Sequence, residues 1–348
     1  MAGYRQKKSN GRKLIIYTAL VIVAGVIIKM YAFPLLVKND PGAEPDVVTP
    51  VHIEETAAAQ PPRTEPQPPS AVNPPPIASS PAPVATNPAE INPSPAPAGS
   101  ADEFYQAGKE ALARQDYIAA REKLSRAVTA GLSPEKEADA RTQLNQAADQ
   151  WLFAARKIYN GDEFCKPYLV QPREILVQIA RLNNVTDGLL KRINNIKDAT
   201  KMPAGQNIKL VHGPFQVKVE KKRYLMTVTL GNIIVRSYRV TLGAPGSETP
   251  TGLSLVKVKT IKPKWPDPVT HKIYEPEDPE NPLGGFWIGL EGLEGAAVGR
   301  SGIGIHGTIK PQEIGQSTSN GCIRLVNENA AELFDLLVEG QSRVTVVD

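Results

Sequence analysis

The sequence has few of the residues that build metal centres and disulfide frameworks. It contains 2 cysteines and 4 histidines among 348 residues, whereas a small fold held by disulfides would carry more cysteines. No spacing of Cys and His suits zinc, and no phosphate-cradling motif is present. The net charge of +4 is modest, which argues against nucleic acid as a partner. We therefore expect neither a metal nor a cofactor.

Large side chains are scarce in one long stretch of the chain. Many of the 32 prolines crowd into residues 41–97, where Ala, Pro, Ser and Val alternate without an apolar period. Burial of such small side chains cannot offset the entropy lost on ordering the chain. We expect a Pro/Ala-rich linker over residues 38–100, without a core of its own.

A basic cluster at the N-terminus is followed by an apolar run. Residues 14–28 are almost uniformly apolar, and if Lys29 snorkels the run extends to Val37, about 36 Å of helix. We expect a cytoplasmic tail at 1–13 and a membrane anchor at 14–37, with the rest outside the membrane, because positive charge stays in the cytoplasm. A cleaved secretory signal and a buried soluble helix are the alternatives.

Helical periodicity dominates residues 101–160. The spacing predicts two helices joined by a turn at 114–116, and a third helix that begins at Ser133-Pro134 and runs through Trp151 and Phe153. The pattern resembles a tetratricopeptide repeat, carried by Gly108, Ala111, Ala120, Leu124 and Ala127. One repeat cannot bury its own face. A spacer that packs on its neighbours and a groove for a protein partner therefore both stay open.

Residues 167–212 are predicted to run strand, helix, helix, strand. The segment contains Ile175, Ile179, Ala180, Asn183-Asn184-Val185, Leu189, Leu190, Asn194-Asn195 and Pro203-Ala204-Gly205-Gln206. Through these residues it resembles a LysM domain, which implies binding to glycans that contain N-acetylglucosamine, such as peptidoglycan strands. The usual Gly-Asp-Thr start is replaced by the residues 171–174, Gln-Pro-Arg-Glu.

From residue 214 to 348 the pattern becomes that of β-strands. Two runs rich in β-branched and aromatic residues, 224–230 and 233–240, flank the hairpin turn Gly231-Asn232. Further strands are expected at 253–258, 286–290, 302–305 and 344–347. One helix is expected at 328–337, with Asn327 as its N-cap. A proline-rich insertion at 262–282, which contains His271, is either a flap or a surface loop.

Two short motifs in this segment carry the chemistry. The first is Ile305-His306-Gly307-Thr308, and the second is Ser319-Asn320-Gly321-Cys322-Ile323-Arg324-Leu325, whose cysteine lies sixteen residues after the histidine. An imidazole can take the proton of a thiol and return it to a leaving amine. Glycine before the cysteine allows close approach of a substrate carbonyl, and N–H groups of the turn could stabilise an oxyanion. An exposed Arg324 could hold a carboxylate or fix the loop.

These motifs, with Thr249-Pro250-Thr251-Gly252 and the closing strand, resemble the YkuD domain of the L,D-transpeptidases. The resemblance implies that Cys322 is the nucleophile, acylated by the third residue of a peptidoglycan stem with loss of D-alanine, before an acceptor amine resolves the thioester. It further implies His306 as base and acid, oriented by the Gly307 carbonyl, and an oxyanion hole at Gly321 and Cys322. Ser319 and Arg324 match positions that support the loop and substrate. Many members have histidine where this chain has Asn320, which leaves its role open.

The prediction for the whole chain is a membrane-anchored, multidomain bacterial cell-wall enzyme. Its catalytic domain is mostly β and acts on stem peptides in the periplasm or cell-wall space. Carboxypeptidase activity, attachment of a protein to peptidoglycan, and a non-catalytic wall-binding scaffold are the rivals. A disulfide between Cys165 and Cys322 is a weaker alternative to a catalytic thiol.

Overall fold

The computed structural model describes residues 99–267 and 270–348, which lie within one compact unit, Ala89–Asp348. The predicted tail, the anchor at 14–37 and nearly all of the linker lie outside the described residues. Within the described ranges, no helix is both long enough and apolar enough to cross a membrane.

Three helices open the described chain, near the positions that the periodicity predicts. The first begins with a capping box, in which Glu103 N donates to Ser100 Oγ and Glu103 Oε2 accepts from Ser100 N. The second is capped by Asp116, which accepts from Ala119 N at 3.1 Å. Their bounds are α2 Ala101–Ala113, α3 Tyr117–Ala130 and α4 Pro134–Trp151.

The end of α4 corrects the prediction that this helix runs through Phe153. The helix ends at Trp151, and Phe153 N donates to Ala148 O at 3.0 Å. This bond spans one residue more than the α-helical pattern and closes the last turn.

The next segment has the predicted order of strand, two helices and strand. Its strands pair antiparallel, with Cys165 opposite Val211. The buried Asn194 ties helix to strand, because it accepts from Lys209 N and donates to Lys209 O and Leu190 O. The elements are β1 Cys165–Leu169, α5 Leu176–Leu182, α6 Asp187–Asn194 and β2 Asn207–Val211.

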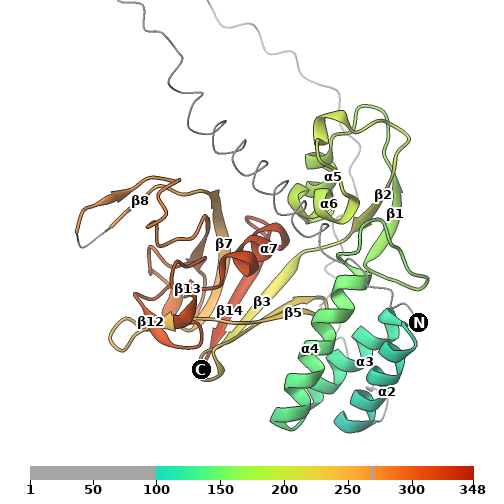
Figure 1. Ribbon diagram of the computed structural model, residues 1–348, viewed down its shortest axis with the longest axis horizontal. Helices are drawn as coiled ribbons and strands as arrows, with labels where there is room; N and C mark the ends of the chain where they lie inside the picture. The colour runs from blue at the N-terminus through green and yellow to red at the C-terminus, as the bar shows by residue number, and fades with distance from the viewer. Residues whose placement is uncertain (1–98, 268–269) are drawn as a thin grey trace, which may run out of the picture. The chain divides into compact units, whose positions relative to one another are not determined.

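The C-terminal segment is built on an eight-stranded sheet in the order β13-β11-β10-β7-β14-β3-β4-β5. Figure 1 shows β3, β14 and β7 side by side, with α7 against them. The mostly β architecture is the one the sequence predicts. The bounds are β3 Phe215–Glu220, β4 Leu225–Leu230, β5 Ile233–Arg239, β7 Gly252–Ile261, β10 Phe286–Gly292, β11 Gly304–His306, β13 Ile323–Arg324, α7 Asn327–Leu336 and β14 Arg343–Val347.

Two details of this segment bear on the sequence predictions. Gly231, at φ +57°, turns the chain between β4 and β5, as the Gly-Asn pair predicts. The N-cap prediction is wrong: Val326 is the N-cap of α7 and Asn327 is its first residue. Smaller strand pairs lie beside the main sheet, β6 Leu242–Gly243 with β12 Ser317–Ser319, and β8 Trp265–Pro266 with β9 Ile273–Tyr274.

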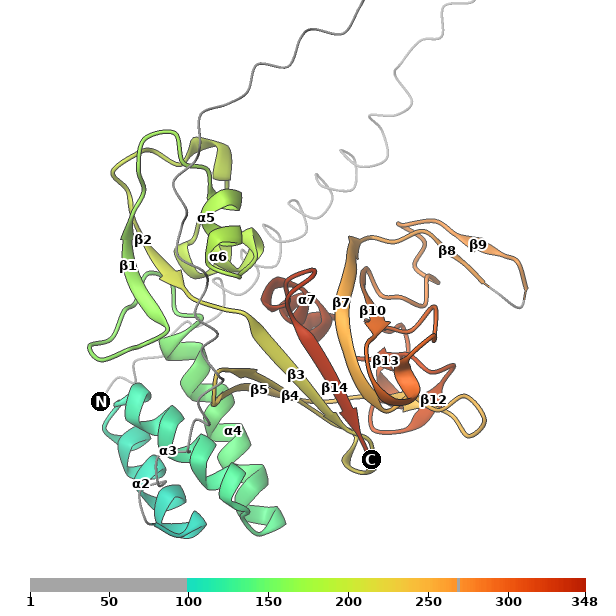
Figure 2. The same ribbon diagram turned by 180° about the vertical axis from the view of Figure 1, so that it is seen from behind.

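Helices α3 and α4 pack on β5, the edge strand of the main sheet, and Figure 2 shows α4 beside this strand. Arg141 on α4 donates to Thr227 and Ser237 at 3.0 Å each. Arg236 on β5 reaches both Asp149 on α4 and Glu332 on α7. One face of α4 is therefore covered by the sheet, which favours the spacer over an open groove along that face.

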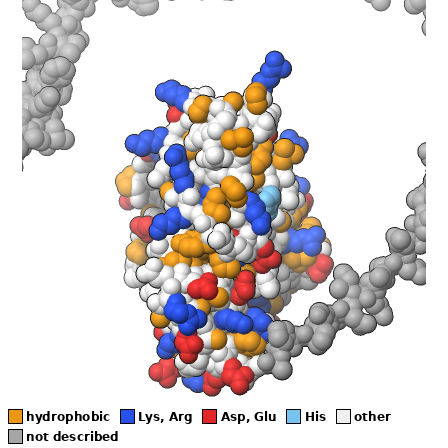
Figure 3. Space-filling model, turned by 90° about the vertical axis from the view of Figure 1, so that its right-hand side faces the viewer, with side chains coloured by type: hydrophobic (Ala, Val, Ile, Leu, Met, Phe, Trp, Pro, Cys, Tyr) orange, Lys and Arg blue, Asp and Glu red, His pale blue; other side chains and the backbone are white. Residues whose placement is uncertain are grey.

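The helical segment also holds the β1–α5–α6–β2 segment. The Lys209 ammonium is buried and donates to the Trp151 and Leu152 carbonyls at the end of α4. Buried Arg121 lies over the Trp151 ring at 4.2 Å, and one of its nitrogens is 3.0 Å from Asp162 Oδ1, although none of its nitrogens makes a hydrogen bond of good geometry. Figure 3 shows the surface on the right-hand side of Figure 1. Hydrophobic side chains lie among Lys and Arg there, and acidic side chains gather toward the lower end.

Candidate active site

The cysteine motif folds as a tight turn closed by Ser319. The Ser319 hydroxyl donates to Cys322 O at 2.6 Å and accepts from Gly321 N at 3.2 Å. Gly321 has φ +104°, a conformation in which a side chain would be strained, and a Cβ there would lie 3.0 Å from Ile303. A second loop stabilises the turn, since Ala244 N donates to Ser319 O at 2.8 Å. The spacing of Ser, Gly and Cys therefore has a local structural cause.

Parallel pairing of two short strands brings His306 and Cys322 to one face of the sheet. In the register of β11 and β13, His306 lies beside Arg324. Residues two apart on a strand share a face, so Cys322, which precedes β13 by one residue, lies on the face that carries His306. Strand spacing and rise put the two Cα atoms roughly 8 Å apart. Side chains directed toward each other can bridge such a separation.

His306 is 4% exposed and is held on two sides. Its Nδ1 lies 2.7 Å from Gly307 O. A carbonyl only accepts, so this contact requires a proton on Nδ1 and leaves Nε2 as the unprotonated nitrogen. The Trp287 ring stacks on the imidazole at 5.9 Å between centroids. Trp287 comes from β10, and no motif in the sequence marked it.

The environment of both candidate groups disfavours their charged forms. Burial, with the positive charge of Arg324, lowers the pKa of His306 from 6.5 to about 4. Burial raises the pKa of the Cys322 thiol above 9.0, against opposite effects of the Gly304 backbone and Arg324. The thiol donates to Gly302 O at 3.4 Å. Both shifts favour the neutral thiol and the neutral imidazole.

Arg324 is not exposed, which corrects the prediction from the sequence. Its side chain is 20% exposed, and Nη1 lies 3.1 Å from Glu313 Oε2. The same carboxylate accepts from Thr318 Oγ1 at 2.8 Å, and Lys310 lies 3.5 Å from its other oxygen. Glu313 is a further residue of this region that no sequence pattern indicated, because its role depends on a contact eleven residues away.

The remaining predicted site residues take distinct positions. Asn320 is exposed at the tip of the turn. The Gly321 N–H is engaged by Ser319, so it would have to exchange this partner to bind an oxyanion. Within the described residues, the Cys322 backbone N–H donates no hydrogen bond. The Thr249 hydroxyl accepts from Gly243 N at 2.9 Å, so the Thr-Pro-Thr-Gly loop supports the strand beside the turn.

Cys165 lies in a different environment from Cys322. Both cysteines are free, so the disulfide alternative is wrong. Cys165 is buried, and its pKa is raised to about 12, chiefly by burial. It is a small apolar core residue and no candidate nucleophile. Among the described residues there is no group of three or more His, Cys, Asp or Glu side chains that could hold a metal ion.

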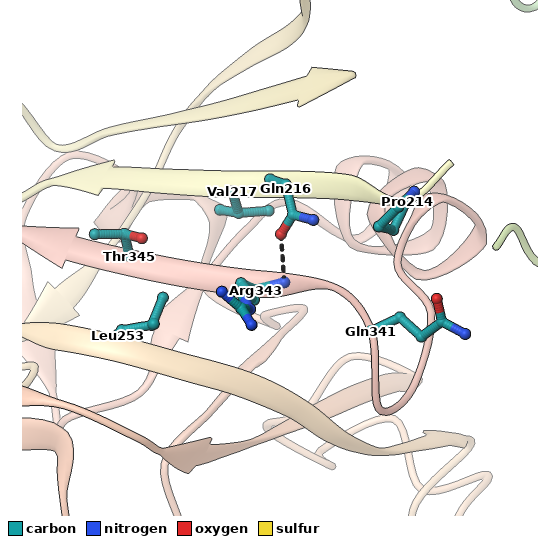
Figure 4. A pocket seen from close by; sticks show the side chains of 7 residues that line it. All are labelled: Pro214, Gln216, Val217, Leu253, Gln341, Arg343 and Thr345. Carbon is teal, nitrogen blue, oxygen red and sulfur yellow. Dashed lines mark hydrogen bonds between the residues drawn. The ribbon is translucent and has the colours of Figure 1, made fainter. Parts of the chain in front are cut away.

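A surface cavity of about 540 Å³ lies elsewhere, along β3 and β14. Figure 4 shows its seven lining side chains and the hydrogen bond of 2.7 Å from Arg343 N to the Gln216 side chain. In the sheet order, β7, β10 and β11 separate β14 from β13. This cavity therefore has no part in the arrangement around Cys322.

Comparison with known proteins matches the segment that holds these residues. The family model of the L,D-transpeptidase catalytic domain, YkuD, matches residues 214–346. YqjB of Bacillus subtilis, assigned to the L,D-transpeptidases, is 35% identical over 148 residues, which are 42% of this chain and 77% of YqjB. YkuD of the same organism, also so assigned, is 27% identical over 186 residues, 51% of this chain and 97% of its own length.

Solved structures give a weaker likeness. An L,D-transpeptidase from Mycobacterium smegmatis has a TM-score of 0.29 and 19% identity over 41% of this chain. This chain spans 64% of that protein, less than two thirds of its length. The catalytic domain of an Enterococcus faecium L,D-transpeptidase has a TM-score of 0.30 and 22% identity, covering 38% of this chain and 95% of the domain. Scores this low carry no weight beside the sequence relatives.

Proposed function

This chain belongs to the L,D-transpeptidase family, and on that premise we propose that it is a peptidoglycan L,D-transpeptidase that works through a thioester on Cys322. The family model and the YqjB relative support the activity. The proposed nucleophile and base are supported by the register of β11 and β13, which pairs His306 with Arg324, two residues after Cys322.

The proposed reaction has two acyl transfers. The thiol sulfur attacks the carbonyl of the third stem residue while its proton passes to His306 Nε2. When the tetrahedral intermediate collapses, the carbon–nitrogen bond to D-alanine breaks and the imidazolium returns the proton to the leaving amine. An acceptor amine then attacks the thioester and gives its proton to His306. As the carbon–sulfur bond breaks, the imidazolium returns this proton to the sulfur, which releases the crosslinked peptide and restores the free thiol.

The low pKa of His306 suits this exchange of protons. An imidazole with a pKa of about 4 is a weak base but, once protonated, a strong acid toward the leaving amine. The Gly307 carbonyl, at 2.7 Å from Nδ1, also stabilises the imidazolium. In this proposal the thiolate never accumulates and exists only as the sulfur–carbon bond forms.

Four further residues have supporting roles in the proposal. Ser319 fixes the turn, and the Cys322 N–H is the oxyanion donor, joined by Gly321 N–H if substrate displaces Ser319. Arg324 lies close enough to lower the pKa of both reacting groups. Its pairing with Glu313 means that a substrate carboxylate would compete with Glu313 for the guanidinium. Asn320, which is exposed on the turn, would contact the substrate.

The proposal extends to the rest of the chain. The N-terminal segment at 14–37 would anchor the protein in the cytoplasmic membrane and the linker would span outward, so that the catalytic domain works in the periplasm or cell-wall space. The LysM-like segment at 167–212 would bind glycan strands and raise the local substrate concentration. Support comes from the sequence motifs, from the strand–helix–helix–strand order, and from apolar side chains exposed on this segment, among them Leu169, Ile175 and Val177.

Product analysis tests the function. The full-length protein is incubated with purified disaccharide-tetrapeptides, beside Cys322→Ala and the matched control Cys165→Ala, and products are identified by mass spectrometry. We expect crosslinked dimers from the wild type and from Cys165→Ala, and none from Cys322→Ala. Tripeptide alone would point to a carboxypeptidase. No product and no adduct on Cys322 would leave a wall-binding scaffold as the better account.

A further inference from the structure

A single peptide unit lies between His306 and the first residue of α7. The carbonyl of this unit, Gly307 O, is 2.7 Å from His306 Nδ1. Its amide, Thr308 N, donates to Asn327 Oδ1 at 2.8 Å. Since the carbonyl and the N–H of one trans peptide point in opposite directions, Asn327 holds the peptide from one side while His306 binds it from the other.

The fit around the Asn327 carbonyl oxygen is tight. A Cβ at Gly307 would lie 2.2 Å from Asn327 Oδ1, and one at Gly284 would lie 2.1 Å from the same atom. Gly284 has φ +63°, which also favours glycine. The chain thus places two glycines where only a bare backbone leaves room for this amide, and the acceptor oxygen has little freedom to move.

The same segment of chain carries the nucleophile and this amide. Asn327 is the fifth residue after Cys322, and between them Leu325 N donates to His306 O at 2.9 Å. Leu325, after the strand, therefore binds the backbone of His306, and Asn327, at the start of α7, binds the Gly307–Thr308 peptide. A shift of α7 would move both supports together.

We infer that Asn327 is a positioning residue for His306, which fixes the Gly307–Thr308 peptide so that Gly307 O accepts the Nδ1 proton and Nε2 stays free to face Cys322. The inference rests on the proposed function for its kinetic consequence, but the tautomer itself is a property of the free protein. Without the amide acceptor, the peptide can rotate and the imidazole can protonate on either nitrogen.

Two substitutions separate this role from a merely structural one. Asn327→Asp keeps the shape and an acceptor oxygen, and adds a negative charge. Asn327→Leu keeps the volume and removes the acceptor. Asn329→Ala is the matched control, because it removes an amide from the same helical turn without touching the Gly307–Thr308 peptide.

The tautomer is read in the full-length protein by ¹⁵N chemical shifts of the imidazole nitrogens, which is practical with 4 histidines in the chain. We expect wild type, Asn327→Asp and Asn329→Ala to hold the proton on Nδ1, and Asn327→Leu to show a mixture. In Asn327→Asp the pKa of His306 rises, because a carboxylate favours the imidazolium. With disaccharide-tetrapeptide, kcat should fall about 10-fold in Asn327→Leu with KM unchanged, as for one lost hydrogen bond.

An unchanged tautomer and kcat in Asn327→Leu would overturn the inference. So would an equal loss in Asn327→Asp and Asn327→Leu, since the aspartate retains the acceptor. If Asn327→Leu does not fold, the Asp variant still decides: an Nδ1 proton with an unshifted His306 pKa would contradict the proposed contact. A tautomer that shifts as expected in a protein that makes no product would support the positioning role while the proposed function fails.

Discussion

The pH dependence of Cys322 alkylation follows directly from the environment of the thiol. Only the thiolate reacts with iodoacetamide, and burial places the Cys322 pKa above 9.0. At pH 7 the thiol is therefore almost entirely protonated. The neutral imidazole cannot enlarge this fraction by forming an ion pair, because its own pKa is about 4.

The expected profile is a rate that rises about tenfold with each pH unit from 6 to 8, without a plateau. His306→Gln should leave the profile nearly unchanged in the free protein, because the imidazole carries no charge in that range. A preformed thiolate–imidazolium pair would behave differently, with a plateau that begins well below pH 7 and vanishes in His306→Gln.

The assay is timed labelling followed by peptide mass spectrometry, which separates Cys322 from Cys165. Cys165 should stay unlabelled in the folded protein, because it is 1% exposed and its pKa is about 12. A Cys322 rate at pH 6 within threefold of the rate at pH 8 would refute the neutral pair and, with it, the argument that proton transfer accompanies attack.

Two further predictions concern stability. Lys209→Met should lower the free energy of unfolding in urea by about 3 kcal/mol, because the buried ammonium donates to two carbonyls at the end of α4. The control Lys191→Met breaks a half-exposed ion pair with Asp187 and should lower it by less than about 1 kcal/mol. Equal losses in the two variants would contradict the stabilising role of Lys209. His306 has a folded-state pKa of about 4 against 6.5, so the unfolded chain binds the extra proton and stability falls as pH falls from 6.5 to 4, by up to about 3 kcal/mol relative to His306→Gln. If the free energy of unfolding of the wild type and of His306→Gln fell equally with pH, the lowered pKa of His306 would be contradicted.

The predictable parts of the structure are those that depend on local chemistry. Helical periodicity placed α2 and α3, and Ser133-Pro134 marked the start of α4. The Gly231-Asn232 pair predicted its hairpin because the turn needs positive φ. The candidate site residues were predicted because Ser, Gly and Cys lie at close spacing, which a single sequence displays, and their catalytic role stays a prediction.

Other features depend on contacts between distant residues and left no local signal. Trp287 covers His306 from the neighbouring strand β10, and only the sheet register brings the two together. Arg324 was expected to be exposed, but Glu313 folds back onto it. Asparagine is a common N-cap residue, which is why Asn327 was predicted to cap α7. Its Oδ1 instead accepts from Thr308 N on another loop, and Asn327 is the first residue of the helix.

The contacts among the three described segments were likewise not predictable from their individual patterns. Glu332 on α7 accepts from Arg192 on α6, and from Arg236 and Tyr238 on β5. Burial of Tyr238 beside this carboxylate raises its pKa well above its usual value of 10.0. A charged residue on a helix is usually solvated, so its position at such a junction appears only in the folded protein.

The most direct test of the central claim is the intact mass of the full-length protein during reaction with disaccharide-tetrapeptide. We expect a transient adduct with the mass of the substrate minus D-alanine, which maps to Cys322 and is absent from Cys322→Ala. Crosslinked product formed by Cys322→Ala at the wild-type rate, or an adduct on another residue, would contradict it.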